Sequence, residues 1–294
     1  MKGKAKPSWI RTKLPTKENF KEIQKILREK NLHTVCEEAF CPNCTECWES
    51  GTATFLLMGD VCTRGCKFCD VKTGNPRQFL DPDEPDNLAH AAKKLKLKYL
   101  VLTSVDRDDL IDGGAEHLAQ CIKRVKELNP GVLVEILIPD FQGDIEALQK
   151  IIEAKPNVIG HNIETTEALT PIVRDKRASF KQSINILKNV KKLDPQILTK
   201  SSIMVGLGET EDQILKALHS LRSANVDIVT LGQYLQPSRK NLAVVEYVKP
   251  HKFKYWEKIA RRMGFLYVVS GALVRSSYRA GELYIRHLLS NHQP

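Results

Sequence analysis

The chain alternates between short apolar runs and longer stretches in which apolar residues recur every three or four positions. The first pattern predicts β-strands and the second predicts amphipathic helices. The expected strands are residues 52–60, 98–105, 132–140, 157–164, 198–209, 226–235 and 266–273. The expected helices between them are residues 85–96, 114–128, 144–154, 179–193, 210–224 and 251–264.

Strands that alternate with helices of this length form βα units around a parallel sheet. The expected fold class is therefore α/β, and the number of units predicts a partial TIM (β/α)6 barrel. A doubly wound open sheet is the competing architecture. In both folds the chemistry lies at the carboxyl ends of the parallel strands, so the residues just after each strand are the candidates for a functional site.

The chain before the first strand has a further helical pattern at residues 17–30, with Phe20, Ile23, Ile26 and Leu27 on one face. No linker rich in proline or serine interrupts the βα units. We therefore expect one barrel domain over residues 51–272. Residues 1–50 form an N-terminal extension that carries cysteines, and residues 273–294 form a C-terminal tail.

Composition and charge narrow the class of protein. Hydrophobic residues make up 42% and charged residues 27% of the 294 residues, which are values of a globular protein. No run reaches the roughly 18 apolar residues that span a bilayer, and no apolar segment follows the basic start. We therefore expect a cytoplasmic protein with no membrane partner. The net charge of +10 fits either a solvated surface or an acidic partner, protein or nucleic acid.

Seven of the eight cysteines lie in residues 35–71, and clustered cysteines in a reducing compartment hold metal or perform redox chemistry. They include two sets: Cys36, Cys41 and Cys47 form C-x4-C-x5-C, and Cys62, Cys66 and Cys69 form C-x3-C-x2-C. The second set follows the first expected strand, so it lies on a loop at the catalytic end of the barrel. The eighth, Cys121, occupies the core side of an expected helix and is interpreted as a small buried hydrophobe.

Zinc is one alternative for these cysteines. The pairs Cys44–Cys47 and Cys66–Cys69 are separated by eighteen residues, which is a zinc-ribbon spacing. Such a protein could use its positive charge to bind nucleic acid. This arrangement leaves three cysteines without a role and places the two pairs on either side of a buried strand.

A ferredoxin-like site is a second alternative. Cys41, Cys44 and Cys47 repeat at the spacing of part of the bacterial ferredoxin run, although the following C-x3-C-P element is absent. These three cysteines therefore remain an alternative set of ligands in the N-terminal group.

The sequence "CTRGCKFC" at residues 62–69 favours an iron–sulfur cluster over both alternatives. Three thiolates on a 4Fe–4S cluster leave one iron open to an external ligand. This spacing, with an aromatic residue before the last cysteine, is typical of radical S-adenosylmethionine enzymes, in which the open iron chelates the methionine part of the cofactor. Phe68 is then expected near the adenine.

Over nearly its whole length the chain resembles the lipoyl synthase family. The resemblance includes "KPSWIRTKLPT", the cysteine region, "LTSVDRDDLIDGGAEH", "HNIETTEALTPIVRDKRASF", "KSSIMVGLGET", "LGQYLQPS" and "RSSYRAGE". The joint presence of both cysteine sets and the RSSY motif is highly specific. Two departures stand out: Cys44 replaces a residue that is usually aliphatic, and Arg279 stands where histidine is frequent.

The resemblance implies two 4Fe–4S clusters and S-adenosyl-L-methionine as cofactors. It assigns Cys62, Cys66 and Cys69 to the radical cluster, and Cys36, Cys41, Cys47 and Ser277 to an auxiliary cluster. In such enzymes hydrogen atoms are removed from carbons 6 and 8 of an octanoyl chain on a carrier lysine. The auxiliary cluster then supplies the sulfur. An unactivated C–H bond offers nothing to acid–base catalysis, so a radical initiator is required.

The resemblance also implies partners. These are octanoylated lipoyl carrier domains, such as the glycine cleavage H protein and the acyltransferase subunits of 2-oxoacid dehydrogenases. An electron donor such as ferredoxin or flavodoxin is expected, and nucleic acid is not. Because carrier domains are typically acidic, the basic surface would steer their docking.

Further residues at strand ends are candidates for cofactor binding. Thr103 and Ser104 stand where related enzymes bind the amino group of the cofactor, although strand-end capping is the alternative for both. Asn162 and Glu164 could hold the ribose hydroxyls. Arg174 and Lys200 could neutralise the cofactor carboxylate or lie on the surface. The three histidines His33, His90 and His117 are expected at the surface or in helix caps.

Overall fold

The computed structural model describes residues 6–10, 18–38, 41, 43, 44, 47 and 54–277, with side chains for all of these except residues 18–20 and 22. Seven parallel strands and one antiparallel edge strand form the main sheet of this described part, in the order β1-β2-β5-β6-β7-β8-β9-β10. The strands are β1 (His33–Thr34), β2 (Thr54–Leu57), β5 (Tyr99–Ser104), β6 (Leu133–Leu137), β7 (Val158–Gly160), β8 (Leu198–Val205), β9 (Ile228–Gln233) and β10 (Tyr267–Gly271).

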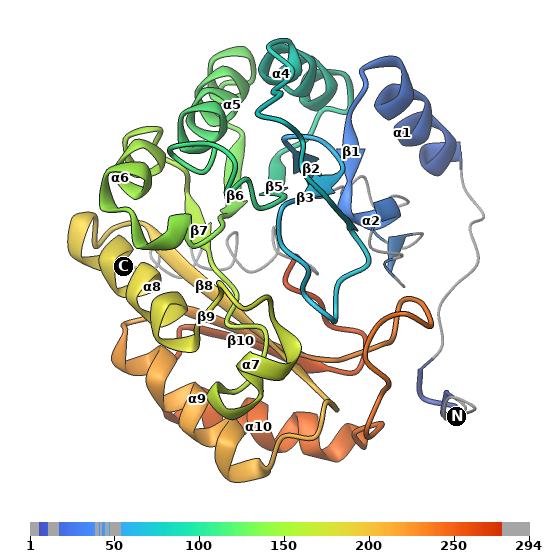
Figure 1. Ribbon diagram of the computed structural model, residues 1–294, viewed down its shortest axis with the longest axis vertical. Helices are drawn as coiled ribbons and strands as arrows, with labels where there is room; N and C mark the ends of the chain where they lie inside the picture. The colour runs from blue at the N-terminus through green and yellow to red at the C-terminus, as the bar shows by residue number, and fades with distance from the viewer. Residues whose placement is uncertain are drawn as a thin grey trace, which may run out of the picture.

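Helices cover the outer face of this curved sheet (Figure 1). The helices are α1 (Glu18–Glu29), α2 (Val35–Glu38), α4 (Glu84–Lys94), α5 (Ala115–Leu128), α6 (Ile145–Glu153), α7 (Thr170–Val173), α8 (Phe180–Leu193), α9 (Glu211–Ser223) and α10 (Pro250–Arg262). Two 3-10 turns, η1 (Phe141–Gly143) and η2 (Glu167–Leu169), follow β6 and β7. All seven expected strands and all seven expected helices are present.

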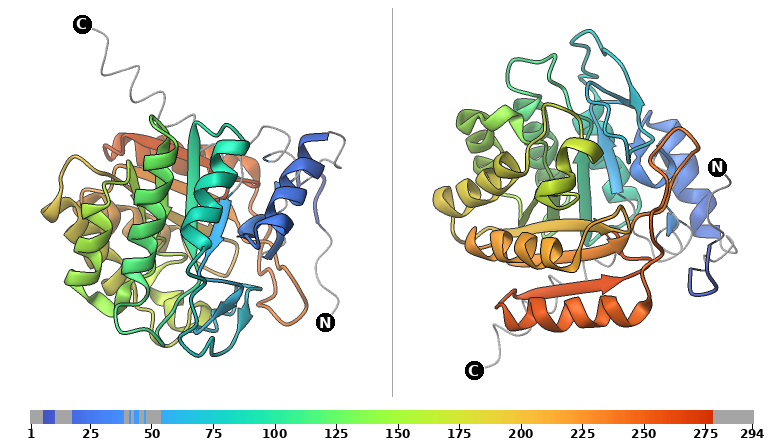
Figure 2. Two further views of the ribbon diagram at one scale, coloured as in Figure 1. Left: turned by 90° about the horizontal axis from the view of Figure 1, so that it is seen from above. Right: turned by 60° about the horizontal axis from the view of Figure 1, so that its bottom comes forward.

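The strand order decides between the two architectures left open by the sequence. Each parallel strand pairs with the next one along the chain, from β2 through β5 to β10. A doubly wound sheet reverses its strand order at a switch point, and this sheet has no reversal. Six strands are each followed by a covering helix, so the prediction of six βα units is confirmed. Strand β10 adds a seventh parallel strand, which lies alongside α10 (Figure 2).

Each of the seven strands is shorter than the apolar run that predicted it, and a turn explains the early end of β7 and β8. Strand β7 ends at Gly160 and the chain then turns, with Glu164 at a φ of 65°. Strand β8 ends at Val205 because Gly206 adopts a φ of 99°, a conformation that leaves the β region. After β7, Asn162 and Glu164 line the cavity at the end of the barrel, whereas after β8 Leu207 packs with Val173 and Tyr234.

The N-terminal extension joins the same core. Strand β1 pairs antiparallel with β2, with His33 opposite Leu56. Helix α1 buries Ile23, Ile26 and Leu27, as its spacing predicted. The side chain of Phe20 lies outside the described set. No helix in the described ranges combines the length and apolarity needed to cross a bilayer.

A buried polar link connects α4 and α5, and it corrects one expectation. The side chain of His117 is buried rather than at the surface, and its Nε2 lies 2.6 Å from a Glu84 carboxylate oxygen. That carboxylate also accepts from the Met58 amide at 3.0 Å. Cys121 is fully buried beside the pair, as expected. His90 is exposed on α4, as predicted, with its Nδ1 at 2.8 Å from the Asp86 carbonyl oxygen.

We expect the His117→Ala substitution to lower the free energy of unfolding by about 1–3 kcal/mol, because it leaves a buried carboxylate without one of its partners. The matched substitution His90→Ala, on the exposed face of α4, should change it by about 0.5 kcal/mol or less. Urea unfolding followed by circular dichroism measures both. Equal effects of the two substitutions would show that the His117–Glu84 contact between α4 and α5 does not stabilise the fold.

Candidate active site

The loop that leaves β2 carries the second cysteine set. Met58 and Gly59 adopt left-handed conformations that turn the chain at the end of the strand. The loop then folds on itself, because the short strands β3 (Val61–Cys62) and β4 (Lys72–Thr73) pair in parallel. The Cys69 amide donates a hydrogen bond to the Cys66 carbonyl at 3.0 Å, which closes a turn between the two cysteines. Cys62, Cys66 and Cys69 therefore share one loop at the carboxyl end of the first parallel strand, where the sequence predicted them.

Backbone N–H groups point at two of these sulfur atoms. Cys62 Sγ accepts from the amides of Asp106 at 3.3 Å and Arg64 at 3.4 Å. Cys66 Sγ accepts from the amide of Asp175 at 3.3 Å. Burial raises the pKa of both thiols to about 12. A positively charged metal centre offsets such a shift, because metal-bound thiols are deprotonated.

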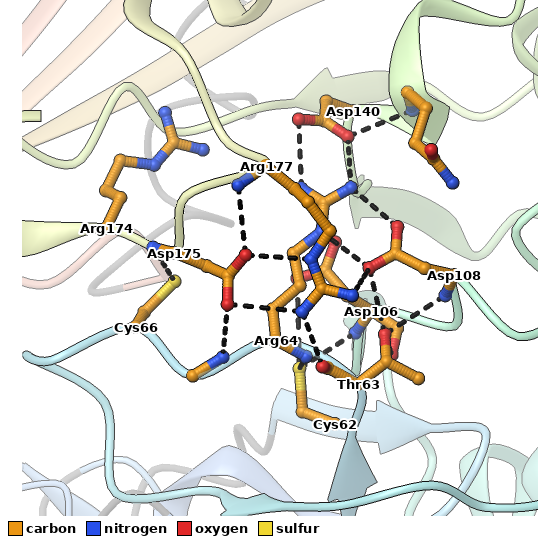
Figure 3. A network of polar contacts seen from close by, with 12 residues as sticks. Cys62, Thr63, Arg64, Cys66, Asp106, Asp108, Asp140, Arg174, Asp175 and Arg177 are labelled. Carbon is orange, nitrogen blue, oxygen red and sulfur yellow. Dashed lines mark hydrogen bonds and ion pairs between the residues drawn. The ribbon is translucent and has the colours of Figure 1, made fainter. Parts of the chain in front are cut away.

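Arg64 lies between two of the cysteines and is the centre of an ion network (Figure 3). Its guanidinium contacts Asp108 at 2.8 Å, Asp140 at 2.7 Å and Asp106 at 3.4 Å. The Arg64 side chain is 4% exposed and Asp140 is fully buried. Burial raises the pKa of Asp106 to about 6, although Arg64 opposes this shift. Burial also favours a higher pKa for Asp140, but the hydrogen bonds from Arg64 outweigh burial and hold the pKa of Asp140 below its usual value.

A second group of contacts reaches the same loop from the segment after α7 (Figure 3). The Asp175 carboxylate accepts from the Gly65 amide at 2.8 Å and from Arg177 at 2.8 Å. Arg177 also donates to the Thr63 carbonyl at 2.7 Å and lies 3.2 Å from Asp108. The hydrogen bond from Arg177 holds the pKa of Asp175 well below its usual range.

The loop after β9 fixes the other side of the cysteine loop. Asn241 donates its amide to the Cys69 carbonyl at 2.7 Å, and the Leu242 N–H donates to the Lys67 carbonyl at 3.0 Å. Burial raises the pKa of Cys69. Four loops, which follow β5, β6, β7 and β9, thus hold one short loop that follows β2.

A cavity of about 320 Å³ opens at this end of the barrel. Cys62, Cys66 and Cys69 line it from the loop after β2, and Ser277 lines it from the chain after β10. Apolar side chains form much of the remaining wall. They include Val35, Leu56, Leu137, Ile203, Met204 and Val274.

Polar atoms without partners face the same cavity. Ser104 Oγ and Asn162 Oδ1 are buried and accept or donate no hydrogen bond within the described part of the chain. Both side chains line the cavity, together with Thr103 and Glu164. Burial raises the pKa of Glu164. Unpaired buried polar atoms are costly, so this wall fits a polar ligand that completes their bonds.

The remaining cofactor-binding candidates have different positions. Phe68 lines the cavity and packs beside Val173 and Tyr234. Arg174 is buried, donates to Ser183 Oγ at 2.8 Å, and lines a smaller neighbouring cavity of about 120 Å³.

Lys200 requires a correction. It lies neither at the surface nor on the cavity wall, because its buried ammonium pairs with Glu135 at 2.7 Å in the interior of the sheet. Glu135 also accepts from the Tyr99 hydroxyl at 2.7 Å. This pairing removes Lys200 from the residues available to a cofactor carboxylate.

The first cysteine set lies on α2 and the turns that follow. The Cys41 amide donates to the Cys36 carbonyl at 3.2 Å, and the Cys44 amide donates to the Cys41 carbonyl at 3.2 Å. Cys47 donates to the Asn43 carbonyl at 2.9 Å. A hydrogen bond to Cys36 raises the pKa of Cys44. The structure therefore places Cys44 beside Cys36 and Cys41. Its geometry does not decide between the set Cys36, Cys41 and Cys47 and the alternative set Cys41, Cys44 and Cys47.

The C-terminal segment approaches this group. Burial, together with Cys36, raises the pKa of Cys41, and the charge of the half-buried Arg275 opposes this shift. Ser277 is the last described residue, so Arg279 and the rest of the tail lie outside the described part.

Several residues of the site escaped the sequence analysis. The acidic partners of Arg64 are spread over two loops, and Asp175 and Arg177 come from a third. Asp106, Asp108 and Asp140 are among the residues just after strands that the sequence marked as candidates, but they received no role there, and "VRDKR" was noted only as part of a resemblance. The signal that could have found them is the density of charge directly after apolar strands, where buried charges are kept only with partners.

Comparisons with known proteins agree with this geometry. Residues 56–221 match the radical SAM superfamily, and residues 2–41 match the N-terminal domain of lipoyl synthase. A lipoyl synthase of Anaeromyxobacter is 54% identical over 98% of both chains. The mitochondrial lipoyl synthase of Rattus norvegicus is 52% identical over 97% of this chain and 78% of its own length. That of Schizosaccharomyces pombe is 53% identical over 96% of this chain and 78% of its own.

Solved structures share the fold at low sequence identity. Methylornithine synthase superposes with a TM-score of 0.57 at 16% identity, over 87% of this chain and 72% of its own. The FeFe-hydrogenase maturase of Carboxydothermus hydrogenoformans superposes with a TM-score of 0.54 at 12% identity, over 93% of this chain and 72% of its own. The match to the radical SAM superfamily and the lipoyl synthase relatives argue against the zinc-ribbon alternative. With relatives of more than 50% identity along almost its whole length, the chain belongs to the lipoyl synthase family of radical S-adenosylmethionine enzymes.

Proposed function

We propose that the cavity of about 320 Å³ is the place where this radical SAM sulfurtransferase inserts sulfur at carbons 6 and 8 of an octanoyl chain on a lipoyl carrier domain. The proposed ligands are Cys62, Cys66 and Cys69 for the radical cluster, and Cys36, Cys41, Cys47 and Ser277 for the auxiliary cluster. When bound, the cofactors supply the radical that removes hydrogen and the sulfide that replaces it.

One observation carries this proposal: Ser277 and the three cysteines of the loop after β2 line the same cavity. The reaction needs hydrogen abstraction and sulfur transfer at the same carbon atom. A substrate held between the two groups reaches both without leaving the cavity.

The chain's own residues suit both ligands of this cavity. Leu56, Leu137 and Met204 offer an apolar wall for an unbranched alkyl chain, and they exclude water from a reactive intermediate. Ser104 and Asn162 offer unpaired polar atoms for the cofactor, and Glu164 offers a carboxylate. We propose Thr103, Phe68 and Arg174 as further contacts, in the roles that the sequence predicted for them.

Other parts of the proposal rest on the family. We propose residues 1–50 as the auxiliary-cluster extension, 51–272 as the barrel and 273–294 as the tail. An electron donor such as ferredoxin or flavodoxin is proposed as well. We also propose a reducing compartment such as the cytoplasm, because clustered cysteines that hold metal occur in such compartments.

The carrier domain is proposed to dock on the loops at the carboxyl ends of the strands. Exposed basic side chains gather on these loops. They are Lys67, Lys72, Arg77, Lys176, Arg239 and Lys240. An acidic carrier surface would be attracted to this rim, and its octanoyl-lysine arm could then enter the cavity.

The sulfur-donor assignment is tested by replacing Cys36, Cys41 and Cys47 with alanine. The purified wild-type protein should contain about eight irons per chain and convert an octanoyl-lysine peptide to a product heavier by two sulfur atoms. The variant should keep about four irons and release deoxyadenosine, because its radical site is intact, but add no sulfur. Anaerobic mass spectrometry measures both products. Sulfur insertion by the variant would refute the proposal.

Arg64 should be required for the radical cluster to stay bound. Arg64→Met leaves Asp140 buried without its partner, a change that costs about 3–5 kcal/mol. In the variant that already lacks Cys36, Cys41 and Cys47, we expect Arg64→Met to reduce the iron content per chain several-fold. Arg262→Met on exposed α10 is the control and should keep its iron. If the double variant Arg64→Met, Asp140→Asn recovers no iron either, the loss has a cause other than the unpaired charge.

Docking through the basic rim predicts a salt-dependent affinity. The dissociation constant for an acidic octanoylated carrier domain should rise about tenfold between low and moderate ionic strength. Reversing Lys72, Lys176 and Arg239 to glutamate should weaken binding further and flatten this dependence. The control reverses Lys254, Lys258 and Arg262 on α10 and changes the net charge equally. Equal weakening by the two triple variants would show that net charge, and not the rim, attracts the carrier.

A further inference from the structure

A hydrogen bond connects the segment before β2 to the segment after β10 at the proposed auxiliary site. The Asn43 side-chain amide donates to the Leu273 carbonyl at 2.6 Å, across 230 positions of sequence. Asn43 is 4% exposed, so water has little access to its side-chain amide. The bond therefore joins the segment that carries the first cysteine set to the segment that carries Ser277.

The backbone of Asn43 is also part of the cysteine segment. Its N–H is hydrogen-bonded to the Cys41 thiol and lowers the pKa of that thiol, against the effect of burial. Its carbonyl accepts from the Cys47 amide at 2.9 Å. One residue thus contacts two of the proposed cysteine ligands through its backbone and the C-terminal segment through its side chain.

The C-terminal segment is placed by a second contact, at Gly232 in β9. The chain turns after β10 with a bond from the Val274 amide to the Gly271 carbonyl at 3.1 Å. The Val274 carbonyl then lies so close to Gly232 that a Cβ atom at this position would be 2.1 Å from its oxygen. No side chain tolerates this approach, so the turn can lie against the strand only because residue 232 is glycine. Ser277 follows three residues later on the wall of the cavity.

We propose that Asn43 and Gly232 are positioning residues that bring Ser277 to the auxiliary cluster. The inference rests on the proposed function, in which Ser277 is the fourth ligand. Asn43 fixes the C-terminal segment to the cysteine turns, and Gly232 gives that segment the space to reach the cavity. Loss of either contact moves the serine away and leaves one iron of the cluster open to outside ligands.

The test uses the full chain with Cys62, Cys66 and Cys69 replaced by alanine, so that only the auxiliary cluster is present. Electron paramagnetic resonance of the reduced cluster is recorded with and without 2-mercaptoethanol as an external ligand. The parent should show little change. Asn43→Ala, Asn43→Asp and Gly232→Ala should each show at least a several-fold larger fraction of thiol-shifted signal, as should Ser277→Ala.

The control is Asn129→Ala, which removes another side-chain amide that donates to backbone carbonyls, at the end of α5. It should leave the signal like that of the parent. Asn43→Asp keeps the size of the side chain but removes the donor, so it remains informative if Gly232→Ala fails to fold. Parental spectra for both Asn43 variants, with an altered spectrum for Ser277→Ala, would overturn this inference and leave the ligand assignment standing. A parental spectrum for Ser277→Ala would overturn both.

Discussion

The buried guanidinium of Arg64 is the constraint on which the site depends. It lies within the cysteine loop after β2, and its partners Asp108 and Asp140 come from the loops after β5 and β6. A charge that is 4% exposed is tolerated only with such partners, so the loop has one stable position across the end of the barrel. Asp175 and Asn241 add contacts from two further loops. Three thiols on a flexible loop thereby gain a fixed geometry.

The open form of the barrel explains how the second half of the site is built. In the described residues, the sheet has edges at β1 and β10 and does not close. The chain between β1 and β2 lies beside one edge of this sheet, and the chain after β10 follows the strand at the other edge. The Asn43–Leu273 bond joins the two segments directly. The cavity is lined by both Cys62 and Ser277 because the fold brings their segments together. Neither segment could form this cavity alone.

Much of the fold was predictable because its signals are local. Apolar period indicated the strands and helices, and in the structure Ser179 and Thr210 cap two of those helices. The spacing of Cys62, Cys66 and Cys69 placed them on one loop, and the following strand pairing confirmed it. His117 and Lys200 were misjudged for a common reason. Polar side chains are usually exposed. The sequence does not show that His117 pairs with Glu84, or Lys200 with Glu135, in the interior of the protein.

The sequence by itself determined the βα alternation, the two cysteine sets and the chemistry that such sets support, because these depend on residue type and short spacing. Only the tertiary structure decided that strand order is sequential, that Arg64 pairs with three acids, and that Asn43 meets Leu273. These contacts join residues that are from about 40 to 230 positions apart, and chain folding in three dimensions sets such distances. The close approach at Gly232 is of the same kind, since only the packed turn shows why a side chain has no room there.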